Sequence, residues 1–268
     1  MVRPKKYLGQ HFLTDQRVAQ KIVDALVSPE DDGVSVIEIG PGTGVLTRYL
    51  VEKKGIDLWL VEIDEESVAH LQAHHHLGDR IIQGDFLELD LSKIGRPKLA
   101  IIGNFPYNIS SQIFFRILDM RDRVTQVVCM LQKEVADRIA SPHGNKTYGI
   151  LSVLLQTYFD IRFLFKVPPG VFFPPPKVMS AVIRLERNQR QQLPCDEKLF
   201  VRVVKQGFQN RRKTLRNALK ALNLPAFEPS SPHSLVTLPV MDKRAEQLSV
   251  DDFIELTTLI EQAHEGSR

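Results

Sequence analysis

Residues 34–44 read VSVIEIGPGTG, and they give the clearest indication of the fold. Its first half, 34–39, is rich in Val and Ile and predicts a strand buried on both faces, as in a parallel sheet. The strand runs directly into Gly40, Gly42 and Gly44, and a helix is expected from about residue 45. Glycines let the backbone turn tightly and approach a ligand outside the carboxyl end of a strand. The stretch therefore predicts the opening strand, loop and helix of an α/β domain with a ligand at the loop.

Outward from this stretch, apolar runs alternate with helical patterns. Further buried strands are predicted at 57–63, 80–83, 99–103 and 125–131, and helices at 43–53 and 65–74. Prolines at 168, 169 and 174–176 exclude a regular helix there, and 181–185 predicts one more strand. Strands that alternate with helices predict a mostly parallel sheet with right-handed crossovers.

The pattern changes beyond Arg187, where the strand signals stop. Helical patterns continue at 197–222 and 250–263, with several prolines in the loop between them. We therefore expect an α/β domain at 1–187, with a basic N-terminal arm, and a small helical domain at 188–268.

Composition excludes several classes of protein. The 268 residues are 43% hydrophobic, enough for one sizeable core and a smaller attached unit. No apolar run approaches the roughly 20 residues that span a bilayer, and no apolar stretch follows the basic N-terminus, so we expect a cytoplasmic protein. The two cysteines lack the spacing of a zinc site or a disulfide scaffold, and adjacent His74, His75 and His76 would point in different directions. We expect no metal.

The spacing of the glycine loop distinguishes between cofactors. A dinucleotide fingerprint, G-x-G-x-x-G, would need its third glycine at Val45, but that glycine comes one residue early. The loop instead resembles the E/D-x-G-x-G-x-G loop of Rossmann-like methyltransferases. Glu62, at the end of the second strand, can accept hydrogen bonds from both ribose hydroxyls, and Asp85, after the third, can accept from an adenine amine. Three such features at successive strand ends predict S-adenosylmethionine as the cofactor.

The fourth strand ends in Asn104-Phe105-Pro106-Tyr107, the sharpest signal in the chain. The N6 lone pair of adenine is delocalised into the ring, so an enzyme must orient this weak nucleophile. The Asn104 oxygen and the backbone carbonyl before or at Pro106 can accept the two N6 hydrogens, and Tyr107 can stack on the ring. Phe172, on a proline-rich loop, could stack on the other face. The alternative is an Asn-Pro turn packed by two aromatic side chains.

These motifs resemble the KsgA-type (RsmA) small-subunit ribosomal RNA adenine N6-dimethyltransferases over nearly the whole chain. The motifs that carry the resemblance are 7–13 (YLGQHFL), 38–44, 104–110 (NFPYNIS), 131–135, 148–149, 172–178 (FFPPPKV) and 209–217 (QNRRKTLRN). The resemblance implies a class I methyltransferase fold with a seven-stranded sheet and an added helical domain. It also implies dimethylation of N6 on two adjacent adenosines in a 3′-terminal hairpin loop of small-subunit RNA, coupled to subunit assembly.

Carried over to this chain, the resemblance implies cofactor contacts by His11, Leu13, Gly40, Glu62, Asp85 and Asn104. We expect Gln10, Gly42, Gly44, Ile63 and Phe86 to complete the cofactor site. The target base would be held by Asn104, Pro106, Tyr107 and Phe172. The RNA would be held by Arg211, Arg212, Lys213 and Arg216. The partners expected are small-subunit RNA and the immature small subunit, with the chain acting as a monomer and without a membrane.

Two positions depart from the family pattern, and other functions stay open. His11 stands where many members have Asn, and Phe105 where many have Leu. The large-subunit RNA methyltransferases that confer macrolide resistance share the N-x-P-Y turn but lack a segment like 211–217. DNA adenine methyltransferases usually have a second proline at the position of Phe105. A different class altogether would be an RNA-docking assembly factor whose methyltransferase site is dispensable.

The segment from Lys198 to Lys220 holds eight basic residues and no acid. On a single helix, one face would carry Arg202, Lys205, Lys213, Arg216 and Lys220, and the opposite face would bury Val201, Val204, Phe208, Leu215, Leu219 and Leu222. The sequence thus predicts a basic ridge that contacts RNA phosphates, although such charge runs are often plain solvated surface.

Overall fold

The computed structural model describes residues 2–28, 33–94, 96–229 and 234–265. The chain divides into two compact units: unit 1 is Met1–Asp137 with Phe159–Asn188, and unit 2 is Arg138–Tyr158 with Gln189–Arg268. Residues 138–158, which the sequence placed with the α/β domain, lie in unit 2 because their helix packs against the C-terminal helices.

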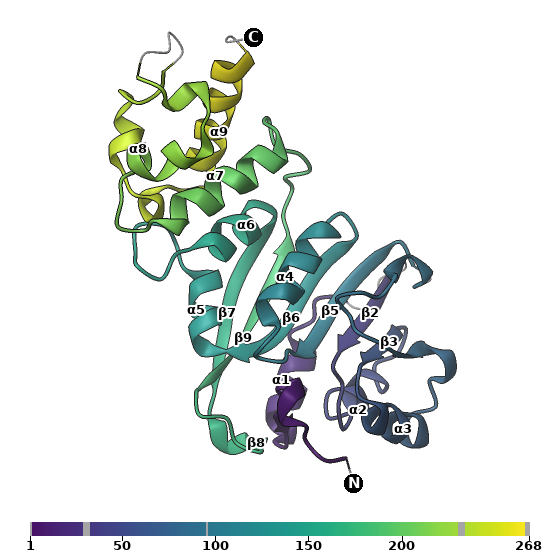
Figure 1. Ribbon diagram of the computed structural model, residues 1–268. Coiled ribbons are helices and arrows are strands. Elements are labelled where there is room, and N and C mark those ends of the chain that lie inside the picture. Colours follow the sequence, from purple (N-terminus) through teal and green to yellow (C-terminus); the bar gives the residue numbers. More distant parts are fainter. Residues whose placement is uncertain (1, 29–32, 95, 230–233, 266–268) are drawn as a thin grey trace. The chain divides into compact units, whose positions relative to one another are not determined.

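Unit 1 is built on a seven-stranded sheet in the order β4-β3-β2-β5-β6-β9-β7 (Figure 1). The strands are β2 Val34–Ile39, β3 Asp57–Glu62, β4 Ile81–Gln83, β5 Lys98–Asn104, β6 Val124–Gln132, β7 Phe159–Val167 and β9 Ser180–Arg187. The first five pair in parallel, and β9 runs antiparallel to both β6 and β7. The predicted α/β class with a mostly parallel sheet is confirmed. β7 was not predicted as a strand.

Both faces of the sheet are buried. Val36, Ala100 and Ile102 on one face share a hydrophobic cluster with Ile22 and Val23 of α1. The alternate residues Ile37, Ile101 and Val127 are also fully buried, as the period of a strand requires when helices cover both faces. This double burial explains why the strands are apolar along most of their length.

The helices of unit 1 are α1 Gln16–Asp24, α2 Thr47–Leu50, α3 Glu65–His74, α4 Ser110–Asp119 and α5 Lys133–Ala140, the last of which continues into unit 2. The Asp15 side chain caps α1, accepting from the amides of Arg17 at 2.8 Å and Val18 at 3.0 Å. The helix predicted at 43–53 is regular only at Thr47–Leu50, because the glycine loop continues as turns. A two-stranded sheet joins β1 Phe12–Leu13 to β8 Phe172–Phe173.

Unit 2 is helical, with α6 Ile150–Tyr158, α7 Glu197–Gln209, α8 Leu215–Ala218 and α9 Val250–Glu265. Short 3-10 turns complete the chain: η1 Lys6–Leu8, η2 Gly78–Arg80, η3 Leu91–Lys93 and η4 Pro169–Val171 in unit 1, and η5 Leu219–Leu222, η6 Pro225–Phe227, η7 Pro239–Asp242 and η8 Ala245–Gln247 in unit 2. Phe208 lies at the centre of the core of unit 2, with its ring centroid 5.9 Å from those of both Tyr148 and Phe253.

The prediction of a single helix at 197–222 is wrong, because α7 ends at Gln209 and the chain turns before α8. The side chains of the predicted apolar stripe are only partly buried. Val204, Phe208, Leu215 and Leu219 are buried, whereas Val201 and Leu222 are half-buried. Among the residues that the structure describes, none of the helices is both long and apolar enough to cross a membrane.

Candidate active site

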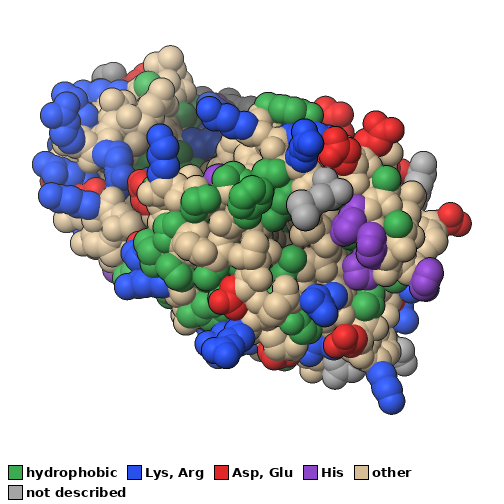
Figure 2. Space-filling model, turned by 90° about the horizontal axis from the view of Figure 1, so that it is seen from below, with side chains coloured by type: hydrophobic (Ala, Val, Ile, Leu, Met, Phe, Trp, Pro, Cys, Tyr) green, Lys and Arg blue, Asp and Glu red, His purple; other side chains and the backbone are tan. Residues whose placement is uncertain are grey.

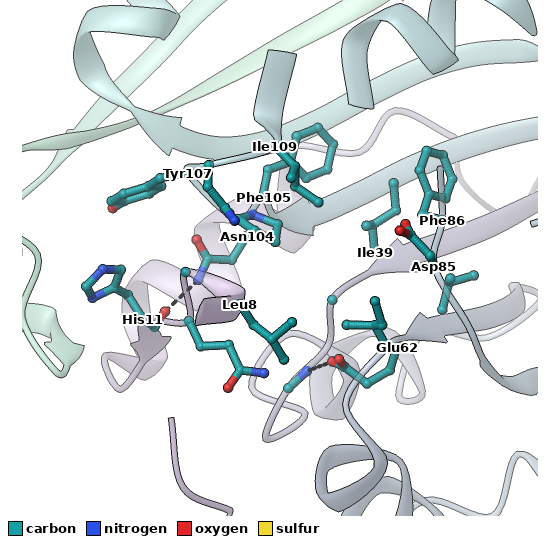
Figure 3. Close-up of a pocket in the computed structure, with 18 of the residues that line it drawn as sticks. Leu8, His11, Ile39, Glu62, Asp85, Phe86, Asn104, Phe105, Tyr107 and Ile109 are labelled. Carbon is teal, nitrogen blue, oxygen red and sulfur yellow. Dashed lines mark hydrogen bonds between the residues drawn. The ribbon is translucent and has the colours of Figure 1, made fainter. Parts of the chain in front are cut away.

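A pocket of about 250 Å³ opens at the carboxyl ends of β2, β3, β4 and β5, where Figure 3 shows it. It is lined by Leu8, Gly9, Gln10, His11, Phe12, Ile39, Gly40, Gly42, Val61, Glu62, Ile63, Gly84, Asp85, Phe86, Asn104, Phe105, Pro106, Tyr107, Asn108 and Ile109. This is the edge at which open parallel sheets bind ligands. Eleven of the fourteen residues predicted to hold the cofactor or the target base line this pocket, whereas Leu13, Gly44 and Phe172 do not.

The glycine loop shapes one wall of the pocket. Gly40 and Gly42 have φ of 63° and 56°, in the left-handed region that favours glycine. A Cβ on Gly42 would lie 2.8 Å from the Phe12 ring, whereas one on Gly40 would meet nothing within 4 Å, and Gly40 lines the open space of the pocket. Gly44 lies outside the pocket and packs against Leu71 and His75.

Glu62 joins the loop to β3. Its side chain is buried, with Oε2 accepting from the Gly42 amide and Oε1 from the Asp64 amide, each at 2.9 Å. Burial raises the pKa of Glu62, although these backbone hydrogen bonds oppose the rise. A carboxylate oxygen can accept two hydrogen bonds, so both oxygens keep acceptor capacity for a bound diol.

Asp85 follows β4 on the opposite side of the pocket from the N-terminal arm (Figure 3). Its Oδ1 accepts from the Leu87 amide at 2.8 Å, which leaves Oδ2 for a ligand. Buried Ile39 and Phe86 line the same region, and Ile63 is 47% exposed at its edge. An acceptor among apolar side chains suits a planar heterocycle that carries an amine.

The N-terminal arm contributes residues 8–12 to the pocket. Lys5 anchors it by an ion pair with the Asp64 carboxylate, whose side chain is 1% exposed. The Lys5 amide also donates to Gln10 Oε1 at 2.8 Å. Leu13 lies beyond the pocket in the hydrophobic core and lines a small adjoining cavity with Glu38 and Asn104.

Asn104 is held in one orientation. Its Nδ2 donates to the His11 carbonyl oxygen at 2.8 Å, the dashed line in Figure 3, so Oδ1 is turned the other way as an acceptor. The Pro106 carbonyl already accepts from the Ile109 amide at 3.3 Å, whereas the Phe105 amide donates to the Met130 carbonyl at 2.9 Å. Phe105 is buried beneath the turn and packs edge-on against Phe114, with 5.8 Å between ring centroids.

Tyr107 is fixed at both ends of its side chain. Its hydroxyl lies 2.5 Å from Ser180 Oγ, and its ring stacks on His11 at a centroid distance of 5.3 Å. The proposed partner on the other face, Phe172, is 4% exposed in the core and pairs with Leu13. Because successive side chains on a strand point to opposite faces, Phe173 is exposed instead. The prediction that Phe172 faces the target base therefore fails in this structure.

Exposed apolar side chains of unit 1 include Tyr7, Phe173, Val178 and Met179. Figure 2 shows hydrophobic side chains gathered on the face seen from below, the side on which the N-terminal arm and β8 lie in Figure 1.

Among the described residues, no group of three or more His, Cys, Asp or Glu could hold a metal ion.

The four predicted RNA-binding residues separate into two pairs. Arg211 is built into unit 2, because its Nη2 donates to the carbonyls of Lys146 at 2.7 Å and Tyr148 at 2.6 Å. Arg216 donates to Asp242 at 2.5 Å. Arg212 and Lys213 are exposed on the turn between α7 and α8. The structure thus gives Arg211 and Arg216 intramolecular partners that the sequence did not reveal.

Glu38 belongs to the predicted glycine loop but was given no role, and several apolar pocket residues were not predicted. Glu38 is buried and accepts from Thr47 Oγ1 at 2.7 Å, and burial raises its pKa to about 8. Ile39, Val61 and Ile109 line the pocket beside the predicted polar residues. Their position at strand ends and turns, next to Gly40, Glu62 and Asn108, was the available signal.

Comparison with known proteins gives consistent matches. The family model described as ribosomal RNA adenine dimethylase matches residues 1–262. Ribosomal RNA small subunit methyltransferase A of Cytophaga hutchinsonii is 54% identical over 260 residues, covering 97% of this chain and 98% of that protein. The protein of the same name from Parabacteroides distasonis is 54% identical, covering 98% and 96%.

Two solved structures share the fold. A dimethyladenosine transferase from Plasmodium falciparum has a TM-score of 0.77 at 24% identity, covering 94% of this chain and 98% of that one. The 23S rRNA methyltransferase ErmE has a TM-score of 0.64 at 23% identity, covering 92% and 99%.

Proposed function

The chain belongs to the ribosomal RNA adenine dimethylase family, and from this membership we propose the identity of its RNA substrate and the role of each site residue. It is an S-adenosylmethionine-dependent ribosomal RNA adenine dimethyltransferase. The proposed substrate is small-subunit RNA, where two adjacent adenosines in a 3′-terminal hairpin loop become N6,N6-dimethyladenosine. The fixed orientation of the Asn104 amide carries the proposal that N6 of adenine is the target, since it presents an acceptor for the N6 amine beside Tyr107.

The pocket residues fit the cofactor. S-adenosylmethionine supplies an electrophilic methyl group on a sulfonium. Glu62 has acceptor capacity for the two ribose hydroxyls, and Asp85 has Oδ2 for the adenine amine. Gly40 lets the loop backbone approach the ligand, because a side chain there would fill the open space.

Asn104 Oδ1 and the Phe105 carbonyl accept the two N6 hydrogens of the target adenine. Two acceptors in fixed positions aim the nitrogen lone pair at the methyl group. The amine nitrogen gains positive charge as the methyl transfers, and the partial negative charges of these oxygens stabilise that change without reorganising. As the methyl group transfers, its bond to the sulfonium sulfur breaks and N6 releases one proton to water. After the first methylation one N6 hydrogen remains, so one acceptor holds it while the other faces the new methyl group.

Tyr107 stacks on the target base and offsets the cost of extruding it. Removing a base from its stack costs a few kcal/mol. Stacking on an aromatic side chain contributes about 1–3 kcal/mol, and each neutral hydrogen bond about 1 kcal/mol. The Ser180 contact holds the Tyr107 ring in place before the base arrives. The Tyr107 ring is therefore positioned before RNA binding.

We assign the wider contacts with RNA to Arg212 and Lys213, which are exposed in unit 2. Phosphate contacts of this kind position an RNA without reading its bases. We further propose that the chain acts in the cytoplasm, as a monomer, on an immature small subunit rather than on a mature ribosome.

The proposal is tested by offering different RNAs to the purified chain with methyl-labelled cofactor. The substrates are protein-free small-subunit RNA, immature small subunits and large-subunit RNA, with Asn104→Ala as the control for site-dependent transfer. Label in small-subunit RNA or immature subunits, absent with the control, supports the proposal. Label confined to large-subunit RNA would assign the activity of the ErmE class, and no label in any RNA would favour a non-catalytic assembly factor.

A further inference from the structure

His11 contacts three parts of the site at once. Its Nδ1 lies 2.7 Å from the Pro174 carbonyl oxygen on the proline-rich loop, and because a carbonyl only accepts, Nδ1 carries the hydrogen. Its ring stacks on Tyr107 with an interplanar angle of 29°. Its own carbonyl accepts from Asn104. Figure 3 shows the imidazole on the same side of Asn104 as Tyr107.

The spacing of the two rings decides what this arrangement can hold. Stacked carbon atoms meet at about 3.5–4.0 Å, so a base between two rings needs them about 7 Å apart. The His11 and Tyr107 centroids are 5.3 Å apart, which leaves no room for a base between them. The imidazole therefore covers one face of the Tyr107 ring, and a base can stack on that face only if the two rings move apart.

Phe172 is not available for this place, because it is buried in the core of unit 1. His11 is half-buried and lies on an arm whose strand is only two residues long. A displacement of about 2 Å would separate the rings enough for a base. The imidazole can make this movement while the backbone carbonyl of His11 keeps its contact with Asn104, since the two are different parts of the residue.

We propose that His11 is a base-contacting residue, whose imidazole covers Tyr107 in the free chain and stacks on the open face of the target adenine when the base enters. The proposal rests on the proposed function, because it concerns the same adenine. The ring keeps apolar surface of Tyr107 out of water before binding and completes an aromatic sandwich afterwards. His11 thus acts on the RNA, in addition to lining the cofactor pocket.

Two matched variants separate stacking from a structural role. His11→Asn keeps a donor for the Pro174 carbonyl but has no ring, whereas His11→Phe keeps a ring but has no donor. If stacking matters, the KM for RNA rises about fivefold to thirtyfold in His11→Asn, which corresponds to about 1–2 kcal/mol of base stacking, and rises less in His11→Phe. If His11 only ties the arm to the proline-rich loop, the order of the two variants is reversed.

A binding experiment provides a second readout that does not depend on turnover. The RNA hairpin carries 2-aminopurine at the target position, and the fluorescence of this base is quenched when it stacks. We expect the bound hairpin to be quenched more by the wild-type chain and His11→Phe than by His11→Asn, while the dissociation constant of the cofactor, measured by calorimetry, changes less than the KM for RNA. Equal quenching by all three, or stronger quenching by His11→Asn, would overturn the proposal for His11. A wild-type chain that methylates no adenosine would instead overturn the proposed function, and the role of His11 with it.

Discussion

Replacing Glu62 with Gln should weaken cofactor binding far more than the small change in shape suggests. The Glu62 oxygens accept from the amides of Gly42 and Asp64, and both keep capacity for a ribose hydroxyl. A glutamine keeps only one acceptor oxygen. Its NH2 group takes the place of the other oxygen and cannot accept a hydrogen bond from the loop amide or from a ribose hydroxyl. Losing one hydrogen bond to a charged group costs about 1.5–3 kcal/mol, so we expect the dissociation constant to rise about 10- to 150-fold.

The assay is calorimetric titration of the free chain with S-adenosylmethionine or S-adenosylhomocysteine. Glu65→Gln is the matched control, because Glu65 is an exposed acid on α3 that lies outside the pocket. Burial raises the pKa of Glu62, so the affinity of the wild-type chain should fall as the pH drops through that raised value, whereas the Gln variant should lack this dependence. A Glu62→Gln dissociation constant within twofold of the wild-type value, in a variant that melts cooperatively, would refute the assignment of the ribose to Glu62.

Asn104→Ala should lower turnover about a hundredfold or more while changing cofactor affinity much less, because a positioned acceptor is lost in the transition state; turnover near that of the parent would contradict this. Glu38→Gln should stabilise the fold at pH 8 by about 1–3 kcal/mol and have little effect at pH 4.5 in thermal or urea melts. Burial raises the pKa of Glu38 from an ordinary 4.5 to about 8 in the folded chain, so between pH 4.5 and pH 8 folding takes up a proton. The stability of the wild-type chain therefore falls as the pH rises from 4.5 to 8. Equal effects of Glu38→Gln at both pH values would contradict the burial of the Glu38 carboxyl. Replacing Arg212 and Lys213 together with Gln should reduce the slope of log RNA affinity against log salt by about 1.4–1.8, without changing cofactor affinity. The matched pair Arg211→Gln and Arg216→Gln should instead lower the melting temperature, because those side chains are bonded within unit 2, and an unchanged slope in the first pair would show that the turn is plain surface.

The sequence predicted the central strands because β2, β3, β5 and β6 are buried on both faces and therefore apolar along most of their length. β7 was missed, because an edge strand that reads FDIRFLFKV mixes charged and apolar residues. The break after Gln209 was missed for a different reason. No Gly or Pro interrupts residues 210–214, and the turn depends on distant contacts such as the donation from the Leu215 amide to the Lys243 carbonyl.

In the candidate site, residues placed by a strand end could be predicted, whereas residues placed by packing against distant parts of the chain could not. Glu62, Asp85 and Asn104 could be predicted because each follows a strand whose carboxyl end must face the pocket. Gly44 and Phe172 also belong to motifs that the sequence revealed, but a motif does not say which of its residues faces the pocket. Only the packing of Gly44 on His75 and of Phe172 in the core decides that. The intramolecular partners of Arg211 were likewise invisible in a run of basic residues.

In the proposed function, this pocket places two methyl groups on N6 of each of two adjacent adenosines in small-subunit RNA. The most direct measurement is mass spectrometry of nucleosides from small-subunit RNA that lacks these modifications, after incubation with the wild-type chain and S-adenosylmethionine, with position mapping of each modified residue. The proposed function predicts N6,N6-dimethyladenosine at two adjacent positions near the 3′ end, and none with Asn104→Ala. Methyl groups on another atom of the base, on the ribose, or on adenosines elsewhere in the RNA would contradict it.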